Sequence, residues 1–364
     1  MPRLSVLDLS PVAAGSTESQ ALHDTIDLGR HADRLGYHRY WLAEHHGGEM
    51  VASSSPELMI GQVAAATEQI RVGSGGVMLP NHSPLRVAEQ FKVLAALFPD
   101  RIDLGIGRAP GTDQMTAYAL RRSREAMAAD DLPEQLGELL AFAGSRPWPE
   151  GHAFSHVRAA PWDAPLPPIF LLGSSDFSAR LAAVAGLGFA FAGQINPEMA
   201  VDALRLYRDE FRPSDQLDAP YAILSHAIVC ADDDESAQRI AAPSRVAFRR
   251  LRTGRPTPLP SVEDAIAEEG PRPAPNPGVT ERMLVGSPLT IRDKADELLT
   301  RSGADELMAM TNVHDPADRR RSYELLAEAF ALEPRSTAER SASATGAASG
   351  KSISATHEGR TSGS

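Results

Sequence analysis

The sequence predicts an α/β fold, a (β/α)₈ TIM barrel in which eight parallel strands alternate with helices. Short apolar runs alternate along the chain with longer stretches that carry apolar residues at helical spacing, which is typical of βαβ units. Several apolar runs end in turns rich in Gly, Ser, Arg or His, and parallel barrels place their ligand sites at these carboxyl ends. A doubly wound open sheet is the alternative, since alternation by itself does not establish closure.

The first part of the chain supports this alternation with clear helix boundaries. Gly36 follows the first helical stretch and is a typical helix stop, while Pro56 and Pro84 suit first helical turns. The expected strands cover residues 4–9, 37–43, 70–79 and 101–105, and the expected helices cover residues 18–35, 57–67 and 84–98.

The second part repeats the alternation and adds two surface insertions. Strands are expected at residues 169–172, 188–191, 221–230 and 306–311, and helices at residues 133–142, 178–185, 197–211, 235–251, 290–302 and 316–330. A loop rich in Pro and Trp at 144–168 and a stretch dense in Pro, Gly and acidic residues at 253–280 are expected to run over the surface. Residues 1–333 would form one barrel domain, and residues 334–364, rich in Ser, Thr, Ala and Gly, a disordered tail.

Charge and composition argue against some partners. The 364-residue chain is 42% hydrophobic, enough for a sizeable core, and its formal net charge is −12. Nucleic acids and anionic membrane surfaces both attract basic proteins, so neither is expected as a partner. The longest nearly apolar run, residues 181–193, is too short and too rich in Gly to span a bilayer as a helix.

The cysteine content fits a cytoplasmic location. Cys230 is the only cysteine, so no intrachain disulfide can form. It lies in an apolar run and is expected to be a small core residue rather than a nucleophile. The first residues lead directly into an apolar run without the pattern of a signal peptide.

A histidine pair follows the second expected strand, in the segment Glu44-His45-His46. A histidine at a barrel mouth can take or give a proton near neutral pH, which makes His45 the candidate catalytic residue. A pair of histidines that only packs at a strand end is the alternative. Glu44, His45, His46 and His82 are conceivable metal ligands, but neighbouring strand positions point to opposite faces, so no metal site is predicted.

Two further turns have the composition of anion sites. Arg108 follows the fourth strand in a Gly-rich turn, where a guanidinium can clamp a phosphate; a structural ion pair is the alternative. Gly173, Ser174 and Ser175 precede a helix. The free amides and hydroxyls at the start of this helix can bind an anion. The alternative is that the serines only cap the helix. The spacing G-x-G-x-x-x-G around Arg108 differs from the dinucleotide fingerprint.

Glycines interrupt the third expected strand, at Gly73, Gly75 and Gly76. Glycine weakens a strand, and its presence indicates a bulge or a close approach to the backbone. A flat ring lying against the strand would explain these glycines, and so would a bulge without a ligand.

Taken together, these motifs resemble the luciferase-like flavin-dependent monooxygenases, the bacterial luciferase superfamily. The resemblance covers residues 4–332 and is carried by residues 41–46, 72–80, 88–90, 101–111 and 168–175. It implies a (β/α)₈ barrel, usually a homodimer, that binds reduced FMN. The resemblance implies that His45 assists proton transfer near the flavin. It also implies that the turns with Arg108, Gly173, Ser174 and Ser175 bind the phosphate of the flavin.

The resemblance also implies two details of the cofactor site. Gly75 and Gly76 would be joined by a cis peptide bond beneath the isoalloxazine ring and so count as cofactor-binding residues. A second arginine would join the phosphate site, and Arg121, Arg122 and Arg124 are equal candidates.

The function implied by the resemblance is that of a two-component monooxygenase. Reduced FMN would come from a separate flavin reductase, because the chain shows no nicotinamide-binding domain, and O₂ would be used on a small organic substrate. One alternative is an oxidoreductase of the same superfamily that transfers hydride with the deazaflavin F420, and another is a flavin-binding protein without catalysis. Residues 111–133 and 253–280 would border the substrate pocket, so the substrate stays open.

Overall fold

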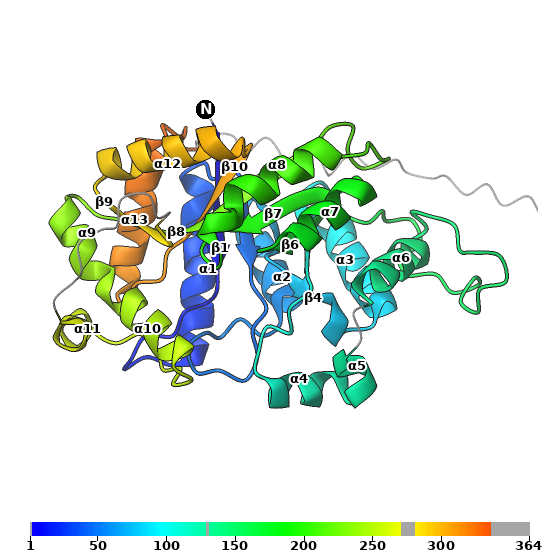
Figure 1. Ribbon diagram of the computed structural model, residues 1–364, viewed down its shortest axis with the longest axis horizontal. Coiled ribbons are helices and arrows are strands. Elements are labelled where there is room, and N and C mark those ends of the chain that lie inside the picture. The colour runs from blue at the N-terminus through cyan, green and yellow to red at the C-terminus, as the bar shows by residue number, and fades with distance from the viewer. Residues whose placement is uncertain (1, 129–130, 271–280, 336–364) are drawn as a thin grey trace, which may run out of the picture.

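The computed structural model describes residues 2–128, 131–270 and 281–335, and its centre is a closed barrel of parallel strands (Figure 1). The eight strands of the ring are β1 (Arg3–Asp8), β2 (Arg39–Leu42), β3 (Arg71–Ser74), β5 (Ile102–Gly107), β6 (Ile169–Gly173), β7 (Gly188–Ala192), β8 (Ala222–Cys230) and β10 (Glu306–Met310). β8 pairs with β10 and so joins the two ends of the sheet. The predicted TIM barrel is therefore confirmed, and the open-sheet alternative is wrong.

The third expected strand is divided in two. It breaks at Gly75 and Gly76, which are joined by a cis peptide bond, as the resemblance implies. Its second part is β4 (Val77–Met78), which pairs with β5. A further strand that the sequence did not predict, β9 (Met283–Gly286), pairs with β8 outside the ring.

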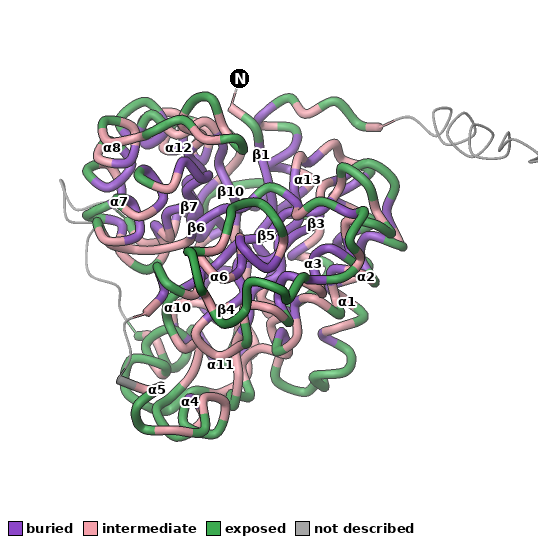
Figure 2. The backbone as a smooth tube through the Cα atoms, turned by 90° about the vertical axis from the view of Figure 1, so that its right-hand side faces the viewer, coloured by how far each residue is buried: buried purple, intermediate pink, exposed green. Residues whose placement is uncertain are grey.

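Helices surround the barrel, so that the buried strands lie inside a shell of partly exposed helices (Figure 2). They are α1 (Glu18–Arg34), α2 (Pro56–Ala66), α3 (Pro84–Leu97), α4 (Gln114–Arg121), α5 (Arg124–Ala128), α6 (Leu132–Ala143), α7 (Asp176–Ala185), α8 (Ala200–Glu210), α9 (Asp234–Ile240), α10 (Ala242–Arg252), α11 (Val262–Glu269), α12 (Pro288–Ser302) and α13 (Pro316–Ala329), with the 3₁₀ turns η1 (Leu79–Asn81) and η2 (Pro197–Met199).

Three segments differ from the expectation. The link at 111–133 contains α4 and α5, and Asp113 starts α4 because its carboxylate accepts the N–H groups of Met115 and Thr116. The helix expected at 235–251 is two helices, α9 and α10, and Pro243 lies in the first turn of the second one. The insertion at 253–280 contains α11, and its residues 271–280 lie outside the described residues, as do residues 336–364 of the expected tail.

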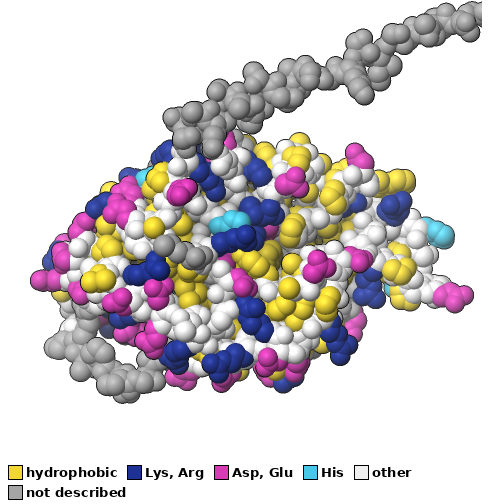
Figure 3. Space-filling model, turned by 90° about the horizontal axis from the view of Figure 1, so that it is seen from above, with side chains coloured by type: hydrophobic (Ala, Val, Ile, Leu, Met, Phe, Trp, Pro, Cys, Tyr) yellow, Lys and Arg dark blue, Asp and Glu magenta, His cyan; other side chains and the backbone are white. Residues whose placement is uncertain are grey.

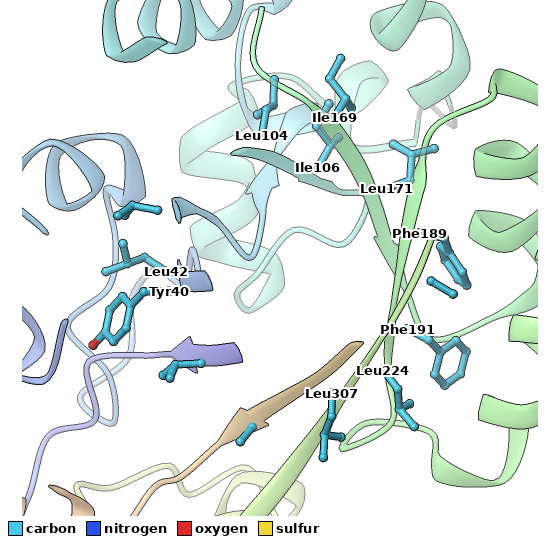
Figure 4. Close-up of a cluster of buried hydrophobic side chains, with 14 of the residues drawn as sticks. Tyr40, Leu42, Leu104, Ile106, Ile169, Leu171, Phe189, Phe191, Leu224 and Leu307 are labelled. Atoms are coloured by element: carbon cyan, nitrogen blue, oxygen red, sulfur yellow. The ribbon is translucent and has the colours of Figure 1, made fainter. Parts of the chain in front are cut away.

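The larger core lies between the barrel and the helices. Outward-facing side chains of the strands pack there against the apolar faces of the helices, and Cys230 is buried among them as expected. Figure 4 shows part of this cluster, with Tyr40, Leu42, Leu104, Ile106, Ile169, Leu171, Phe189, Phe191, Leu224 and Leu307 labelled.

A smaller core fills the middle of the barrel. Leu7, Trp41, Phe170, Ile223 and Met308 are buried there, and the rings of Trp41 and Phe170 meet edge to face with their centres 5.1 Å apart. Because this apolar plug closes the interior, a ligand of the barrel has to bind at one of its two ends.

The end with the amino termini of the strands is closed by buried charges. Arg39 lies 2.6 Å from Asp103 and 3.0 Å from Glu306, and Arg71 lies 2.6 Å from the second oxygen of Asp103. The hydroxyl of Tyr221 donates to Glu306. Burial by itself raises the pKa of Asp103, but Arg39 and Arg71 outweigh it and hold this pKa below its usual range. We call these four charged residues, Arg39, Arg71, Asp103 and Glu306, the floor of the barrel. Because each charge is paired, the floor has a structural role.

The outer surface at the same end carries both signs of charge. Figure 3 views the molecule from the side of the N-terminus and shows acidic and basic side chains interspersed across the face. Such a surface does not attract a polyanion by charge. Among the described helices, none has both the length and the apolar character needed to cross a membrane.

The floor network makes a testable prediction about stability. Arg39→Leu leaves two buried carboxylates without their shared cation, so the free energy of unfolding is expected to fall by about 3–5 kcal/mol. Urea denaturation measures this change. The control is Arg30→Leu, which breaks an exposed pair with Asp27 and is expected to cost about 1 kcal/mol or less. Equal losses in the two variants would show that the floor charges contribute no more than surface charges.

Candidate functional site

The three polar turns singled out in the sequence lie at one end of the barrel. They follow β2, β5 and β6, and because the strands run parallel, their carboxyl ends share one rim. Figures 1 and 2 show α4, α5, α10 and α11 at this end, away from the N-terminus. The candidate site is therefore the mouth enclosed by these loops and helices.

Hydrogen bonds connect the loops around this mouth. They run from Val12 N–H to Met50 O, His46 N–H to Gly111 O, Asn81 Nδ2 to Pro110 O, Asn196 Nδ2 to Ser174 O, Ser244 Oγ to Asn312 O, and His314 Nε2 to Ala14 O. Each bond joins segments that follow different strands, so these segments hold one another in place.

His45 lies directly after β2 and has an unused nitrogen. Trp41 and Ala43 belong to the apolar plug, and His45 lies two residues further on, in the loop after β2. Its main-chain N–H donates to the oxygen of Ser53 at 2.8 Å, whereas its buried Nδ1 has no hydrogen-bond partner among the described residues. Burial lowers the pKa of His45, although the neighbouring carboxylate of Glu44 opposes this shift. A neutral imidazole with one open nitrogen can therefore meet a ligand at neutral pH.

Glu44 holds the turn that carries His45. Its buried carboxylate accepts hydrogen bonds from His46 Nε2 at 2.7 Å, from His82 Nε2 at 2.8 Å and from the main-chain N–H of Met78 at 2.8 Å. These bonds connect the loops that follow β2 and β4. The described residues contain no group of three or more His, Cys, Asp or Glu side chains arranged to hold a metal ion.

The pKa values of this cluster move in opposite directions. Burial raises the pKa of Glu44, but the hydrogen bonds from His82, His46 and Met78 outweigh it, and the pKa is lowered overall. Burial lowers the pKa of His82, but the hydrogen bond and the charge of Glu44 outweigh it, and the pKa is raised overall. The arrangement thus favours the ion pair between Glu44 and His82.

Arg108 and the serine turn lie side by side. The guanidinium carbon of Arg108 is 4.3 Å from the ring centre of Phe177, a residue in the first turn of α7. Ser175 occupies the N-cap position of α7, but its side chain makes no capping hydrogen bond, so capping does not account for this hydroxyl. Asp176 adds a carboxylate to the same turn. This carboxylate would repel a dianion bound next to Ser174 and Ser175, and the positive charge of Arg108 would offset the repulsion.

Of the three arginines left open by the sequence, Arg121 is connected to the mouth. Its Nε donates to Asn81 Oδ1 at 3.0 Å, and the amide of Asn81 donates to Pro110 O at 2.9 Å. Arg122 ends α4 with a left-handed φ of 62°, and Arg124 is exposed at the start of α5. Of the three, Arg121 is therefore the arginine whose described hydrogen bond leads to the loops of the mouth.

The glycines at the break of the third strand are explained by contacts within the protein. A Cβ atom added to Gly75 would lie 2.5 Å from Leu7 Cδ1, and one added to Gly76 would lie 2.8 Å from the oxygen of Gly105. The close approach of the backbone of β5 requires glycine at position 76, whereas a side chain at position 75 would displace the end of the Leu7 side chain in the plug. A flat ring is thus not needed to explain them.

Several polar residues of the mouth were missed by the sequence reasoning. Nine side-chain polar atoms of the described residues are buried without a hydrogen-bond partner, and five of them belong to β2, β7, β8 and β10 or to the loops that follow. These five are His45 Nδ1, Gln194 Oε1, Ser225 Oγ, His226 Nδ1 and Asn312 Oδ1. Buried polar atoms normally have partners, so their gathering at one end of the barrel indicates a ligand site.

The closed barrel and its polar mouth define a TIM-barrel protein with a ligand site at the carboxyl end of the strands. Residues 2–306 match the model of the luciferase-like monooxygenase family, and the chain belongs to this family. The predicted family is confirmed.

Two relatives and one solved structure are similar over nearly the whole chain. YvbT of Bacillus subtilis (strain 168) is 47% identical, over 90% of this chain and 96% of the relative. A luciferase-like monooxygenase of Escherichia coli (strain K12) is 42% identical, over 88% of this chain and 95% of the relative. The crystal structure of apo-MsnO8 has a TM-score of 0.84 at 43% identity and covers 92% of this chain and 100% of that chain.

Other similar proteins have names that mention a substrate or a cofactor. The N-acetyl-S-alkylcysteine monooxygenase of Bacillus subtilis (strain 168) is 35% identical, over 92% of this chain and all of the relative. Two more distant structures share the fold: the oxygenating constituent of 3,6-diketocamphane monooxygenase from Pseudomonas putida in complex with FMN, and the F420-dependent tetrahydromethanopterin reductase of Methanopyrus kandleri. Their TM-scores are 0.67 and 0.61, with 21% and 14% identity, and they cover 92% and 91% of this chain and 99% of each other chain.

The ion pair between Glu44 and His82 makes the stability of the protein depend on pH. Because the pKa of His82 is raised, the pair stabilises the folded chain below the ordinary histidine pKa of about 6.5 and is lost as the pH rises through the raised value. Because the pKa of Glu44 is lowered, its contribution is present above the ordinary value of about 4.3 and is lost as the pH falls through the lowered value. The difference in Tm between wild type and His82→Gln is therefore expected to be largest between about pH 5 and 6.5 and to shrink toward pH 9.

Differential scanning calorimetry across this pH range checks the expectation. The control is His23→Gln, which changes an exposed histidine on α1 and is expected to give a small difference at every pH. A difference between wild type and His82→Gln that grows with pH would contradict the ion pair.

Proposed function

We propose that the protein is a two-component monooxygenase that takes reduced FMN from a separate flavin reductase and uses O₂ to oxidise a small organic substrate. The observation that carries this proposal is the position of Arg108 beside the uncapped serine turn of α7, on the same rim as the open nitrogen of His45. The names of several relatives support a monooxygenase. A homodimer in the cytoplasm remains part of this proposal.

The chemistry of the mouth suits a flavin mononucleotide. The phosphate of FMN is a dianion, and Arg108 with Ser174 and Ser175 offers a cation and hydroxyl groups for it. The isoalloxazine is a flat ring with polar edges, and the mouth combines the partly buried apolar side chains of Leu172 and Met310 with unpartnered polar atoms. Bound reduced FMN would supply the electrons and the carbon at which O₂ is activated.

The protein's own residues would position the cofactor and handle protons. Arg108 would offset the charge of the phosphate, and the serine turn would orient it by hydrogen bonds. His45, kept neutral by burial, could take a proton at Nδ1 and return it during turnover, while Glu44 holds the turn in place. The connected loops and the apolar plug would keep water away from the reacting atoms.

Two alternatives share the same cradle. One is an oxidoreductase that uses F420; an F420-dependent reductase shares the fold at 14% identity. The other is a protein that binds the flavin through the same phosphate turn but catalyses no reaction. Binding of FMN and F420, followed by oxygen consumption, distinguishes the three possibilities.

The phosphate contact is tested by comparing two flavins. Arg108→Ala is expected to weaken binding of photoreduced FMN roughly 10- to 100-fold, because hydrogen bonds to a charged group contribute about 1.5–3 kcal/mol. Binding of reduced riboflavin, which lacks the phosphate, is expected to stay unchanged. Anaerobic fluorescence titration measures both, with Arg124→Ala on the exposed start of α5 as the control. An equal loss for riboflavin, or tight wild-type binding of F420 in place of FMN, would contradict the FMN assignment.

The catalytic role of His45 is tested separately from binding. His45→Ala is expected to keep the FMN affinity within about twofold while turnover falls roughly 10²- to 10⁴-fold, the usual contribution of a general acid or base. Oxygen consumption with reduced FMN and a panel of thioethers and aldehydes measures turnover. His23→Ala, outside the mouth, is the control and should match the wild type. If His45→Ala abolishes FMN binding while the barrel stays folded, His45 is a cofactor anchor instead of a proton-transfer residue.

A further inference from the structure

Three polar atoms of the mouth have no role in the chemistry proposed so far. They are Gln194 Oε1 after β7, Ser225 Oγ in β8 and Asn312 Oδ1 after β10, and each is buried without a hydrogen-bond partner. Ser225 is only 4% exposed, so solvent does not satisfy its hydroxyl. Groups buried in this way carry a desolvation penalty that a bound molecule can remove.

Ser225 lies on the inner side of the barrel, next to the turn that carries Gln194. Ser225 is in register with Ala192 of β7 and with Met308 of β10, which belongs to the apolar plug. The main-chain N–H of Gly193 donates to the oxygen of Ser225 at 2.8 Å. Gln194 follows Gly193 in the turn after β7, so it lies beside Ser225 at the same end of the barrel.

Asn312 lies in the loop directly after β10, the strand paired with β8. Met310 packs against the plug, whereas the next residue, Thr311, donates its hydroxyl to the oxygen of Ile228 in β8. Asn312 is thus held at the same end of the barrel as Ser225 and Gln194.

Helix α10 connects the ends of this group. The hydroxyl of Ser244 donates to the main-chain oxygen of Asn312. One turn further along α10, Phe248 lies under the guanidinium of Arg282, whose carbon is 5.0 Å from the ring centre. Arg282 in turn donates to the main-chain oxygen of Gln194 at 2.9 Å. The helix α10 thus contacts the loop after β10 directly and is connected to the loop after β7 through Arg282.

The groups that face the ligand on this side are neutral. The nearby charges are engaged elsewhere, since Arg282 donates to the main-chain oxygens of Gln194 and Ile195, and Glu281 pairs with Lys294 at 2.8 Å. Amides and a hydroxyl recognise neutral groups that both donate and accept hydrogen bonds. The three unpartnered groups themselves supply no cation that would offset the lost hydration of a carboxylate.

This side of the mouth is separate from the proposed phosphate turn. In the ring of eight strands, β7 is four positions from β2, which places Gln194 across the barrel from His45. The phosphate turn follows β5 and β6 and borders one edge of the group. A molecule held by Gln194 and Ser225 would therefore face His45 from the opposite wall, with Asn312 at its side after β10.

We propose that Gln194, Ser225 and Asn312, next to α10, bind the organic substrate, and that they select an apolar molecule with a neutral amide or hydroxyl group over a carboxylic acid. That the bound molecule is a substrate rests on the proposed function. The three residues are specificity-determining residues of that site.

The experiment compares probes of equal length. Binding of hexanamide, hexan-1-ol and hexanoate is measured by titration calorimetry and ligand-observed NMR, on the flavin-free full-length protein and after addition of oxidised FMN. The wild type is expected to bind hexanamide and hexan-1-ol at least roughly tenfold more tightly than hexanoate. The combined variant Gln194→Met, Ser225→Ala and Asn312→Leu is expected to lose this preference, and the single variants to lose part of it.

A matched control comes from outside the mouth. Gln135 on α6 also has a buried side-chain oxygen without a partner, and Gln135→Met is expected to leave probe binding unchanged. Calorimetric Tm values show whether each variant is folded, and the single variants provide the test if the combined variant is not.

The outcomes separate this inference from the proposed function. Absence of hexanamide binding, a preference for hexanoate, or a preference that survives in all variants would overturn the inference. Weaker FMN binding with unchanged probe binding would also overturn it and make these residues flavin contacts. If the wild type binds hexanamide through the three residues but binds no FMN, the inference holds for a neutral ligand and the proposed function fails.

Discussion

The pairing of β8 with β10 is the interaction on which the candidate site depends. It joins the ends of a parallel sheet, and closure places the carboxyl ends of all barrel strands on one rim. Residues far apart in the sequence, such as His45, Arg108 and Asn312, thereby come to surround one mouth. An open sheet would have distributed the same turns along an edge.

The interior of the barrel changes its chemistry from one end to the other. At the amino ends, Arg39, Asp103 and Glu306 satisfy one another and leave no charge for a ligand. The middle is apolar and filled by side chains such as Trp41. Among the described residues, buried polar atoms without hydrogen-bond partners form a group only at the carboxyl ends of the strands. These atoms lost their hydration when the chain folded, and a ligand that bonds to them can recover that free energy.

Much of this could be predicted from the sequence. Strands and helices followed from apolar periodicity, and the turns at His45, Arg108 and Ser175 followed from polar residues directly after apolar runs. The helix α4 was missed because its start depends on a side-chain cap from Asp113, which a short polar segment does not reveal. Gln194 and Asn312 were missed because their place beside Ser225 depends on strand pairing and closure, and no local motif marks them. The roles of the site residues in binding and catalysis remain predictions.

The hydrogen bonds between neighbouring loops have a consequence for how such a barrel can change. The loop after β5 supplies the acceptors, Gly111 O and Pro110 O, for groups on the loops after β2 and β4. Replacing this loop with that of a relative would remove hydrogen-bond acceptors from two neighbouring loops at once. Diversification of this mouth, in nature or in the laboratory, should therefore proceed by exchanging adjacent segments as sets rather than singly.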